Sequence, residues 1–223
     1  MEERFKMMKE IKGAIFDMDG VLFDSEALWQ RFWKEAAEKR GIVLPEQFKK
    51  DICGSGGDLM NTVVKKYYQV EDGWPIMYEV FENLQNYLKE HYPDEKPGLH
   101  EILKDLKVRG FKIAVASSST HEMIERNLTH YHVRDYFDNI TSGTEVQHGK
   151  PAPDIFLLAA ERLGLSPEEC YVFEDAYNGI KAASAAGARP VMVVDQVEPD
   201  ETISALCFYV AHSLTEADHK LLK

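Results

Sequence analysis

Acidic or hydroxyl side chains directly follow three short apolar runs of the sequence. In chain order they are Asp17 and Asp19, Ser117–Ser119, and Glu174 and Asp175. If the runs are neighbouring parallel strands, these side chains meet in one crevice, because open parallel sheets bind ligands beyond the carboxyl ends of their strands. Two carboxylates about 4 Å apart repel each other by roughly 4 kcal/mol at an effective dielectric near 20. The pattern therefore requires a cation.

The oxygen-rich character of these residues favours magnesium as that cation. Mg²⁺ takes one or two carboxylates and completes its shell with water or phosphate oxygens. No cluster of histidines and cysteines in the sequence competes for a softer metal. We therefore expect a bound Mg²⁺ and a phosphorylated ligand.

Lys150 offers a second positive charge for the same ligand. It precedes Pro151 and Pro153, which hold the backbone extended and prevent a helix before Asp154. A lysine on a stiffened loop ahead of a helix is a suitable counter-charge for a phosphoryl group. We expect Lys150 to face the four carboxylates.

The elements that must position these residues alternate between strands and helices. Buried strands are predicted at residues 13–16, 112–116, 171–173 and 191–194, and an edge strand at 205–210. Helices are predicted at 122–130, 155–163 and 177–186, with Thr120, Asp154 and Gly187 as their caps or stops. This order predicts an α/β fold with a doubly wound parallel sheet.

The stretch from Ser25 to Lys96 has a different character, with no strand pattern. Its apolar residues recur at helical spacing in three groups, Leu28, Phe32 and Ala36, then Met60, Val63, Val64 and Tyr67, then Ile76, Val80, Leu84 and Leu88. An ordinary crossover needs about a dozen residues, far fewer than this stretch contains. We therefore expect an inserted all-helical cap domain at 25–96, opened by Ser25 as N-cap, and an α/β core formed by 1–24 and 97–223.

Composition narrows the class of function. The 223 residues carry a formal net charge of −12, which argues against a nucleic-acid partner, and 44% of them are apolar, as in a packed globule. No apolar run approaches the roughly 18 to 20 residues that span a bilayer, and the charged N-terminus lacks the apolar segment of a secretory signal. Three widely spaced cysteines form no recognisable disulfide or metal pattern. We expect a cytoplasmic protein without a membrane partner, and a monomer by default.

Taken together, these residues resemble the haloacid dehalogenase superfamily. Its four motifs occur in order, as Asp17-Met18-Asp19-Gly20-Val21, Ser117, Lys150 before Pro-x-Pro, and Glu174-Asp175 with Gly179 beyond. The match runs from about Ile11 to Val194, and the helical insertion lies where subclass I of the superfamily has its cap. The segments 23–26 and 150–154 look like the branch that contains β-phosphoglucomutase and sugar-phosphate phosphatases.

The resemblance implies a role for each motif. Asp17 would be the nucleophile that forms an aspartyl-phosphate, and Asp19 the general acid and base. The implied Mg²⁺ ligands are Asp17, Asp175 and the backbone carbonyl of Asp19, with Glu174 in support. The implied contacts to the phosphoryl group or substrate come from Lys150, Ser117, the backbone near Met18 and Ser118, Ser119, and Gly54 in the cap.

Two departures from β-phosphoglucomutase favour hydrolysis over phosphoryl transfer within a sugar. Trp29 stands twelve residues after Asp17, where the mutase has a histidine, and the cap loop 53–58 lacks the mutase's arginine. The reading is thus a magnesium-dependent phosphatase of a small phosphorylated metabolite, such as a sugar phosphate, with a phosphosugar mutase as the alternative. A receiver-like signalling module is disfavoured by the early position of Asp17 and by the insertion. A non-catalytic relative is disfavoured because the four motifs are intact.

Overall fold

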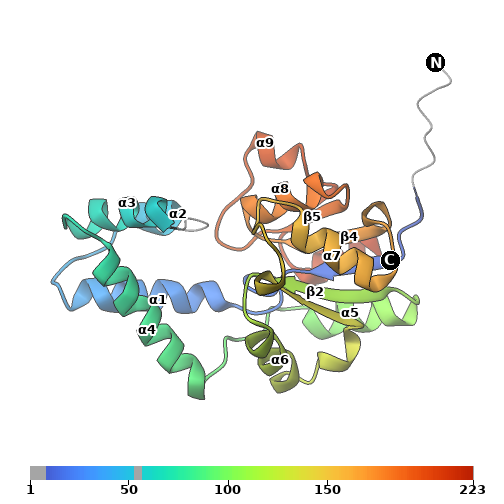
Figure 1. Cartoon of the computed structure of the whole chain (residues 1–223), viewed down its shortest axis with the longest axis horizontal. Helices are drawn as coiled ribbons and strands as arrows, with labels where there is room; N and C mark the ends of the chain where they lie inside the picture. The colour runs from blue at the N-terminus through green and yellow to red at the C-terminus, as the bar shows by residue number, and fades with distance from the viewer. Residues whose placement is uncertain (1–8, 53–56, 223) are drawn as a thin grey trace.

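A six-stranded parallel sheet forms the centre of the computed structural model, which describes residues 9–52 and 57–222 (Figure 1). The strands are β1 (Gly13–Phe16), β2 (Lys112–Ser117), β3 (Asn139–Ser142), β4 (Cys170–Glu174), β5 (Arg189–Val193) and β6 (Tyr209–Ala211). Their order across the sheet is β3-β2-β1-β4-β5-β6, and each neighbouring pair is parallel. The motif strands β1, β2 and β4 are therefore direct neighbours.

Helices cover both faces of this sheet. The first face carries α5 (Leu99–Val108), α6 (His121–His130) and α10 (Leu214–Leu221), and the second carries α7 (Asp154–Leu163) and α8 (Tyr177–Ala185), with the short α9 (Glu201–Ser204) beside α8. Alternate residues of β1 supply the two cores: Ala14 and Phe16 pack on the first face and Ile15 on the second. The predicted α/β fold with a doubly wound parallel sheet is confirmed.

The insertion after β1 is a helical unit with a hydrophobic core of its own. It contains α1 (Ser25–Glu38), α2 (Glu46–Ile52), α3 (Gly57–Tyr68) and α4 (Trp74–Glu90), drawn in blue to green beside the sheet in Figure 1. Trp33, Phe48 and Tyr68 are buried at its centre, and the Tyr68 hydroxyl donates a 2.6 Å hydrogen bond to the Trp33 carbonyl. Trp29 joins this cluster and stacks on Phe81, with ring centroids 6.4 Å apart.

Two chain segments connect the helical unit to the sheet, and they lie side by side. The Asp24 N–H donates to the Asp94 carbonyl at 2.7 Å, and the Lys96 N–H donates to the Leu22 carbonyl at 2.9 Å. The Lys96 ammonium group also pairs with Asp24 at 3.2 Å and with Asp195, in the loop after β5, at 2.7 Å. The entry and exit of the insertion are thereby joined to each other and to the sheet.

Several local predictions need correction. The Thr120 side chain accepts from the Met123 N–H as expected, but Asp154 does not cap α7, because its carboxylate binds His148 instead. Ser25 is the first residue of α1 rather than its N-cap. The predicted edge strand starts later, at 209, because the turn that ends α9 continues through 205–207. None of the described helices has the length and apolar character needed to cross a bilayer.

Candidate active site

A cavity of about 280 Å³ opens at the carboxyl ends of β1, β2 and β4. Its lining residues are Asp17, Asp19, Glu26, Ser117, Ser118, Lys150, Glu174, Asp175, Ala176, Asn178 and Gly179. Because β1 pairs with β2 on one side and with β4 on the other, residues far apart in the sequence reach one place. The structure thus brings all four sequence motifs together.

Lys150 lies between two carboxylates at the base of this cavity. Its ammonium group pairs with Asp17 Oδ1 and, at 2.6 Å, with Glu174 Oε1, and the side chains of all three residues are at most 10% exposed. The second oxygen of Glu174 accepts from the Ala176 N–H at 2.9 Å. Both Glu174 oxygens therefore have protein partners, which makes Glu174 a support for Lys150 and for the loop after β4.

Negative charge in this cluster exceeds what Lys150 neutralises. The pKa of Asp17 is raised to about 8, mainly by burial and in part by the charges of Glu174 and Asp19, against the attraction of Lys150. Burial, followed by Glu174 and Asp17, also raises the pKa of Asp175 well above its ordinary value. The pKa of Lys150 is itself raised, because its two carboxylate partners outweigh burial. These shifts are the expected signature of carboxylates that share a site without enough counter-charge.

The residues present fit a cation that uses few side-chain ligands. Within residues 9–52 and 57–222, no group of three or more His, Cys, Asp or Glu side chains is arranged to hold a metal, so the four carboxylates form no ready-made cage. Asp17 and Asp175 nevertheless line one cavity. A Cβ on Gly20 would come within 2.2 Å of Asp175 Oδ2, so glycine makes room for that carboxylate. Two carboxylates with backbone, water and phosphate oxygens meet the needs of Mg²⁺.

Two serines at the end of β2 hold Asp19: Ser117 is the last residue of the strand and Ser119 lies in the loop that follows. The Asp19 Oδ2 atom accepts from the Ser119 hydroxyl at 2.9 Å and from the Ser117 hydroxyl at 3.3 Å, and the Ser119 N–H donates to Ser117 Oγ at 3.1 Å. Ser117 and Ser118 line the cavity, whereas Ser119 is in contact with Asp19 and is absent from the lining. Met18 is fully buried and is absent from the cavity lining. Gly54 lies outside the described residues.

Sequence reasoning missed Glu26, Ala176 and Asn178, which also line the cavity. Glu26 lies in the first turn of α1 and reaches the site from the helical unit, where Gln30 donates a 2.8 Å hydrogen bond to it. The motif 23–26 had marked this position in the sequence, but only the direction of α1 shows that the carboxylate faces the cavity. Trp29, in contrast, packs within the helical unit.

The ionisation of Glu26 should make the folded protein less stable above neutral pH. Burial raises the pKa of Glu26 to about 7 from an ordinary value of 4.5, so between these values the unfolded chain loses a proton that the folded chain keeps. Stability therefore falls as pH rises through this window. We expect Glu26→Gln to remove that fall, so that its gain over the wild type is about 2 to 3 kcal/mol larger at pH 8 than at pH 4.5.

Urea unfolding in EDTA at the two pH values measures this difference. Glu82→Gln is the matched control, since Glu82 is an exposed glutamate of the same helical unit. An equal dependence of stability on pH in the wild type and in Glu26→Gln would contradict the expectation.

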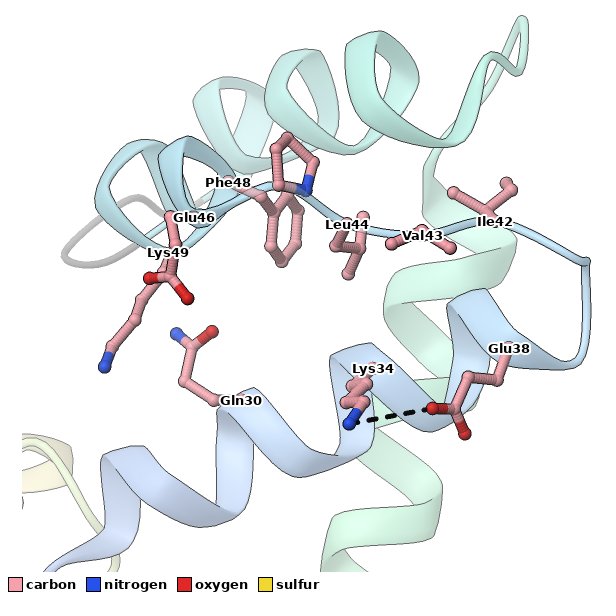
Figure 2. A pocket seen from close by; sticks show the side chains of 10 residues that line it. Gln30, Lys34, Glu38, Ile42, Val43, Leu44, Glu46, Phe48 and Lys49 are labelled. Atoms are coloured by element: carbon pink, nitrogen blue, oxygen red, sulfur yellow. Dashed lines mark ion pairs between the residues drawn. The ribbon is translucent and has the colours of Figure 1, made fainter.

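A separate cavity of about 320 Å³ lies within the helical unit, between α1 and the segment that leads into α2 (Figure 2). It is lined by Gln30, Lys34, Glu38, Ile42, Val43, Leu44, Pro45, Glu46, Phe48 and Lys49. No residue of the four motifs takes part, and Lys34 and Glu38 form an exposed 3.8 Å ion pair with each other. The cavity at the strand ends is therefore the candidate active site.

Comparison with known proteins agrees with this assignment. Residues 11–187 match the family model of haloacid dehalogenase-like hydrolases. The chain is 33% identical over 194 residues to a phosphorylated carbohydrates phosphatase of Thermotoga maritima, covering 81% of this chain and 84% of that protein. It is 31% identical over 217 residues to hexitol phosphatase B of Escherichia coli, covering 95% and 96%.

A solved structure with a similar fold supports the same family. A putative β-phosphoglucomutase from Thermotoga maritima superposes with a TM-score of 0.74 at 28% identity, covering 94% of this chain and 98% of the other. This fold agrees with the family model and with the two curated phosphatases. The chain belongs to the haloacid dehalogenase-like hydrolase family.

Proposed function

We propose that this protein is a magnesium-dependent phosphatase that hydrolyses a small phosphorylated sugar or polyol through an aspartyl-phosphate at Asp17. The observation that carries the proposal is the grouping of Asp17, Asp19 and Lys150 in one cavity at the strand ends. The names of the two curated relatives support a carbohydrate or hexitol phosphate as substrate. The net charge of −12 favours a small metabolite over a nucleic acid.

In the first half of the reaction, the phosphoryl group passes from the substrate to Asp17. Lys150 binds Asp17 Oδ1, which leaves Oδ2 to attack phosphorus in line. As the bond between phosphorus and the substrate oxygen breaks, Asp19 gives that oxygen a proton. Lys150 and the Ser117 hydroxyl neutralise charge on the transferring oxygens, because positioning and electrostatics supply most of the catalysis in phosphoryl transfer.

In the second half, water attacks the phosphorus of the aspartyl-phosphate. Asp19, having lost its proton, now accepts one from this water, and inorganic phosphate leaves while the Asp17 carboxylate is restored. Asp17, Asp175 and the Asp19 carbonyl would hold Mg²⁺, which supplies positive charge to the phosphoryl oxygens and to the carboxylates. Glu174 keeps Lys150 in place through both halves.

We further propose that residues 25–96 are a cap over the core formed by 1–24 and 97–223. Glu26 reaches the catalytic cavity from this segment. A neighbouring cavity of about 300 Å³ is lined from both sides, with Lys50 and Leu59 facing Tyr177 and Lys181. Closure of the cap would exclude all water except the nucleophile.

Removing divalent cations should abolish phosphate release. Without Mg²⁺ the buried carboxylates lack a counter-charge, so we expect turnover in EDTA to fall by at least about a hundredfold and to return when MgCl₂ is added in excess. The measurement is phosphate release from a hexitol phosphate after dialysis. Equal turnover with and without EDTA would contradict a metal-dependent reaction.

A screen of hexose and hexitol phosphates, with phosphate release as the signal, tests the substrate class. The same reactions also test the mutase alternative, which is supported by the similar fold of the putative β-phosphoglucomutase. A hexose 1-phosphate that isomerises faster than it releases phosphate would show a mutase. Phosphate release without isomerisation is the outcome that we expect, because α1 offers a tryptophan at position 29 where the mutase has a histidine.

A further inference from the structure

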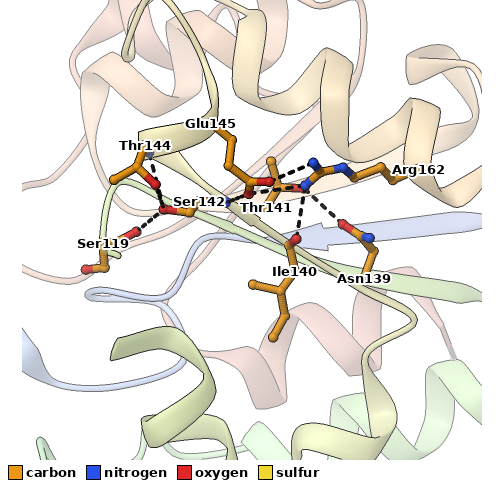
Figure 3. A network of polar contacts seen from close by, with 8 residues as sticks. All are labelled: Ser119, Asn139, Ile140, Thr141, Ser142, Thr144, Glu145 and Arg162. Carbon is orange, nitrogen blue, oxygen red and sulfur yellow. Dashed lines mark hydrogen bonds and ion pairs between the residues drawn. The ribbon is translucent and has the colours of Figure 1, made fainter. Parts of the chain in front are cut away.

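The turn after β3 packs directly against the loop that holds Asp19 (Figure 3). Strands β2 and β3 are neighbours in register, with Ser117 beside Ser142. The Ser142 hydroxyl donates a 2.7 Å hydrogen bond to the backbone carbonyl of Ser119. A Cβ on Gly143 would lie 2.9 Å from Ser118 Cα, so the two backbones approach this closely only because residue 143 is glycine.

A second set of contacts fixes the orientation of Ser142. Its N–H donates to Glu145 Oε2 at 2.7 Å, and its Oγ accepts from the Thr144 N–H at 3.2 Å. Arg162, on α7, binds both oxygens of Glu145, at 2.7 and 3.2 Å. Hydrogen bonds from Arg162 and from Ser142 lower the pKa of Glu145 to about 2, so this carboxylate stays charged at neutral pH.

Ser119 connects Ser142 to Asp19, the proposed proton donor. Ser119 receives the Ser142 hydroxyl on its carbonyl and donates its own hydroxyl to Asp19 Oδ2 at 2.9 Å. Ser142 is 0% exposed, so water has no direct access to replace its hydroxyl if that group is removed. The Ser119 carbonyl would then lose its partner, so we expect the loop on which Asp19 depends to shift.

We propose that Ser142, locked by Glu145 and Arg162, is a positioning residue for Asp19. It fixes the Ser119 backbone, and the Ser119 hydroxyl in turn fixes the carboxylate that exchanges protons with the leaving oxygen. The inference rests on the proposed function, which gives Asp19 that proton transfer. A displacement of about 1 Å at a reacting group can cost about a hundredfold in rate. Ser142 can therefore have a measurable effect on the rate although it acts on Asp19 only through Ser119.

Substrates with different leaving groups distinguish this role from general damage. An alkoxide leaving group, as in a hexitol phosphate, needs a proton from Asp19, whereas p-nitrophenolate leaves without one. Because kcat/KM reports the steps up to phosphoryl transfer, we expect Ser142→Ala to lose about 10- to 100-fold in kcat/KM on hexitol phosphate and less than about 3-fold on p-nitrophenyl phosphate. Equal losses on both substrates, or no loss on either, would overturn the proposal.

Matched variants complete the experiment. Tyr68→Phe removes a hydroxyl from a buried side chain of the helical unit, where it bonds the Trp33 carbonyl and none of Ser119, Ser142, Glu145 or Arg162, and it should keep the ratio of the two kcat/KM values. Ser119→Ala combined with Ser142→Ala should lose little more than Ser119→Ala alone, and additive losses would contradict the pathway through Ser119. Should Ser142→Ala fail to fold, Glu145→Gln, at a side chain 31% exposed, tests the same ratio.

The design also separates this inference from the proposed function. A wild-type protein that hydrolyses neither phosphate would refute both together. A wild type active on both phosphates, with an unchanged ratio in Ser142→Ala and Glu145→Gln, would refute the positioning role alone.

Discussion

Asp17→Asn should abolish phosphate release without lowering the stability of the fold. The amide cannot form the covalent intermediate, so we expect turnover to fall by at least about a thousandfold. Stability should respond in the opposite direction. The pKa of Asp17 is raised to about 8, so as pH rises from about 4 towards 8 the unfolded chain releases a proton that the folded chain keeps, and the wild type becomes less stable. Asparagine carries no such proton.

Two measurements on the same protein check this expectation. Phosphate release from a hexitol phosphate in MgCl₂ reports the chemistry, and urea unfolding in EDTA at pH 5 and pH 8 reports the stability. We expect the variant to equal or exceed the wild type in free energy of unfolding, with the larger advantage at pH 8. Residual turnover above about one percent would show that another residue is the nucleophile.

Lys150→Met should also abolish turnover, but it should destabilise the protein. Asp17 and Glu174 would remain buried without the ammonium group that now contacts both. Breaking a buried ion pair by removing one partner typically costs about 3 to 5 kcal/mol. The raised pKa of Lys150 means that its stabilising charge is present at all pH values below its ordinary pKa of 10.5.

The deficit of Lys150→Met should be smaller at pH 5 than at pH 8, because the two carboxyls can take up protons once their partner is gone. Urea unfolding in EDTA at both pH values measures it. Lys104→Met, at an exposed position of α5, is the control and should unfold like the wild type. A variant as stable as the control at pH 8 would show that Lys150 does not neutralise this cluster. Loss of activity with opposite changes in stability would identify Asp17 and Lys150 as opposite charges of one site.

The sequence was sufficient to predict the strands that carry the motifs, for a physical reason. A parallel strand covered on both faces must be apolar throughout, so β1 stands out as Gly13–Phe16 and ends where the first acidic residue begins. Strand β3 was missed because it reads Asn-Ile-Thr-Ser, with one large apolar residue. Its polar side chains and backbone take part in the contacts around Arg162, which no pattern along the chain reveals.

Part of the candidate site was also predictable, because its residues stand at the ends of these recognisable apolar strands. Motif residues follow their strands directly, so the sheet alone brings Asp17, Ser117 and Asp175 together. Glu26 and Ser119 depend on how a helix or loop is turned, and the sequence does not give that direction. Ser119 donates its hydroxyl to Asp19, and its expected contact with the substrate stays a prediction. The bound Mg²⁺ and the aspartyl-phosphate stay predictions that the experiments above can test.

The paired connections at Asp24 and Lys96 restrict how the helical unit can travel. A single tether would allow it to swivel freely, whereas two adjacent backbone segments, cross-linked to each other, resist twisting and permit bending along one axis. In the proposed closure, bending of this kind would return Glu26 to the cavity that Asp19 also lines. Because Lys96 also pairs with Asp195, the proposed bending would act on the loop after β5 as well. Under the proposed closure, the two cross-linked connections would by themselves keep the helical unit aligned with the sheet.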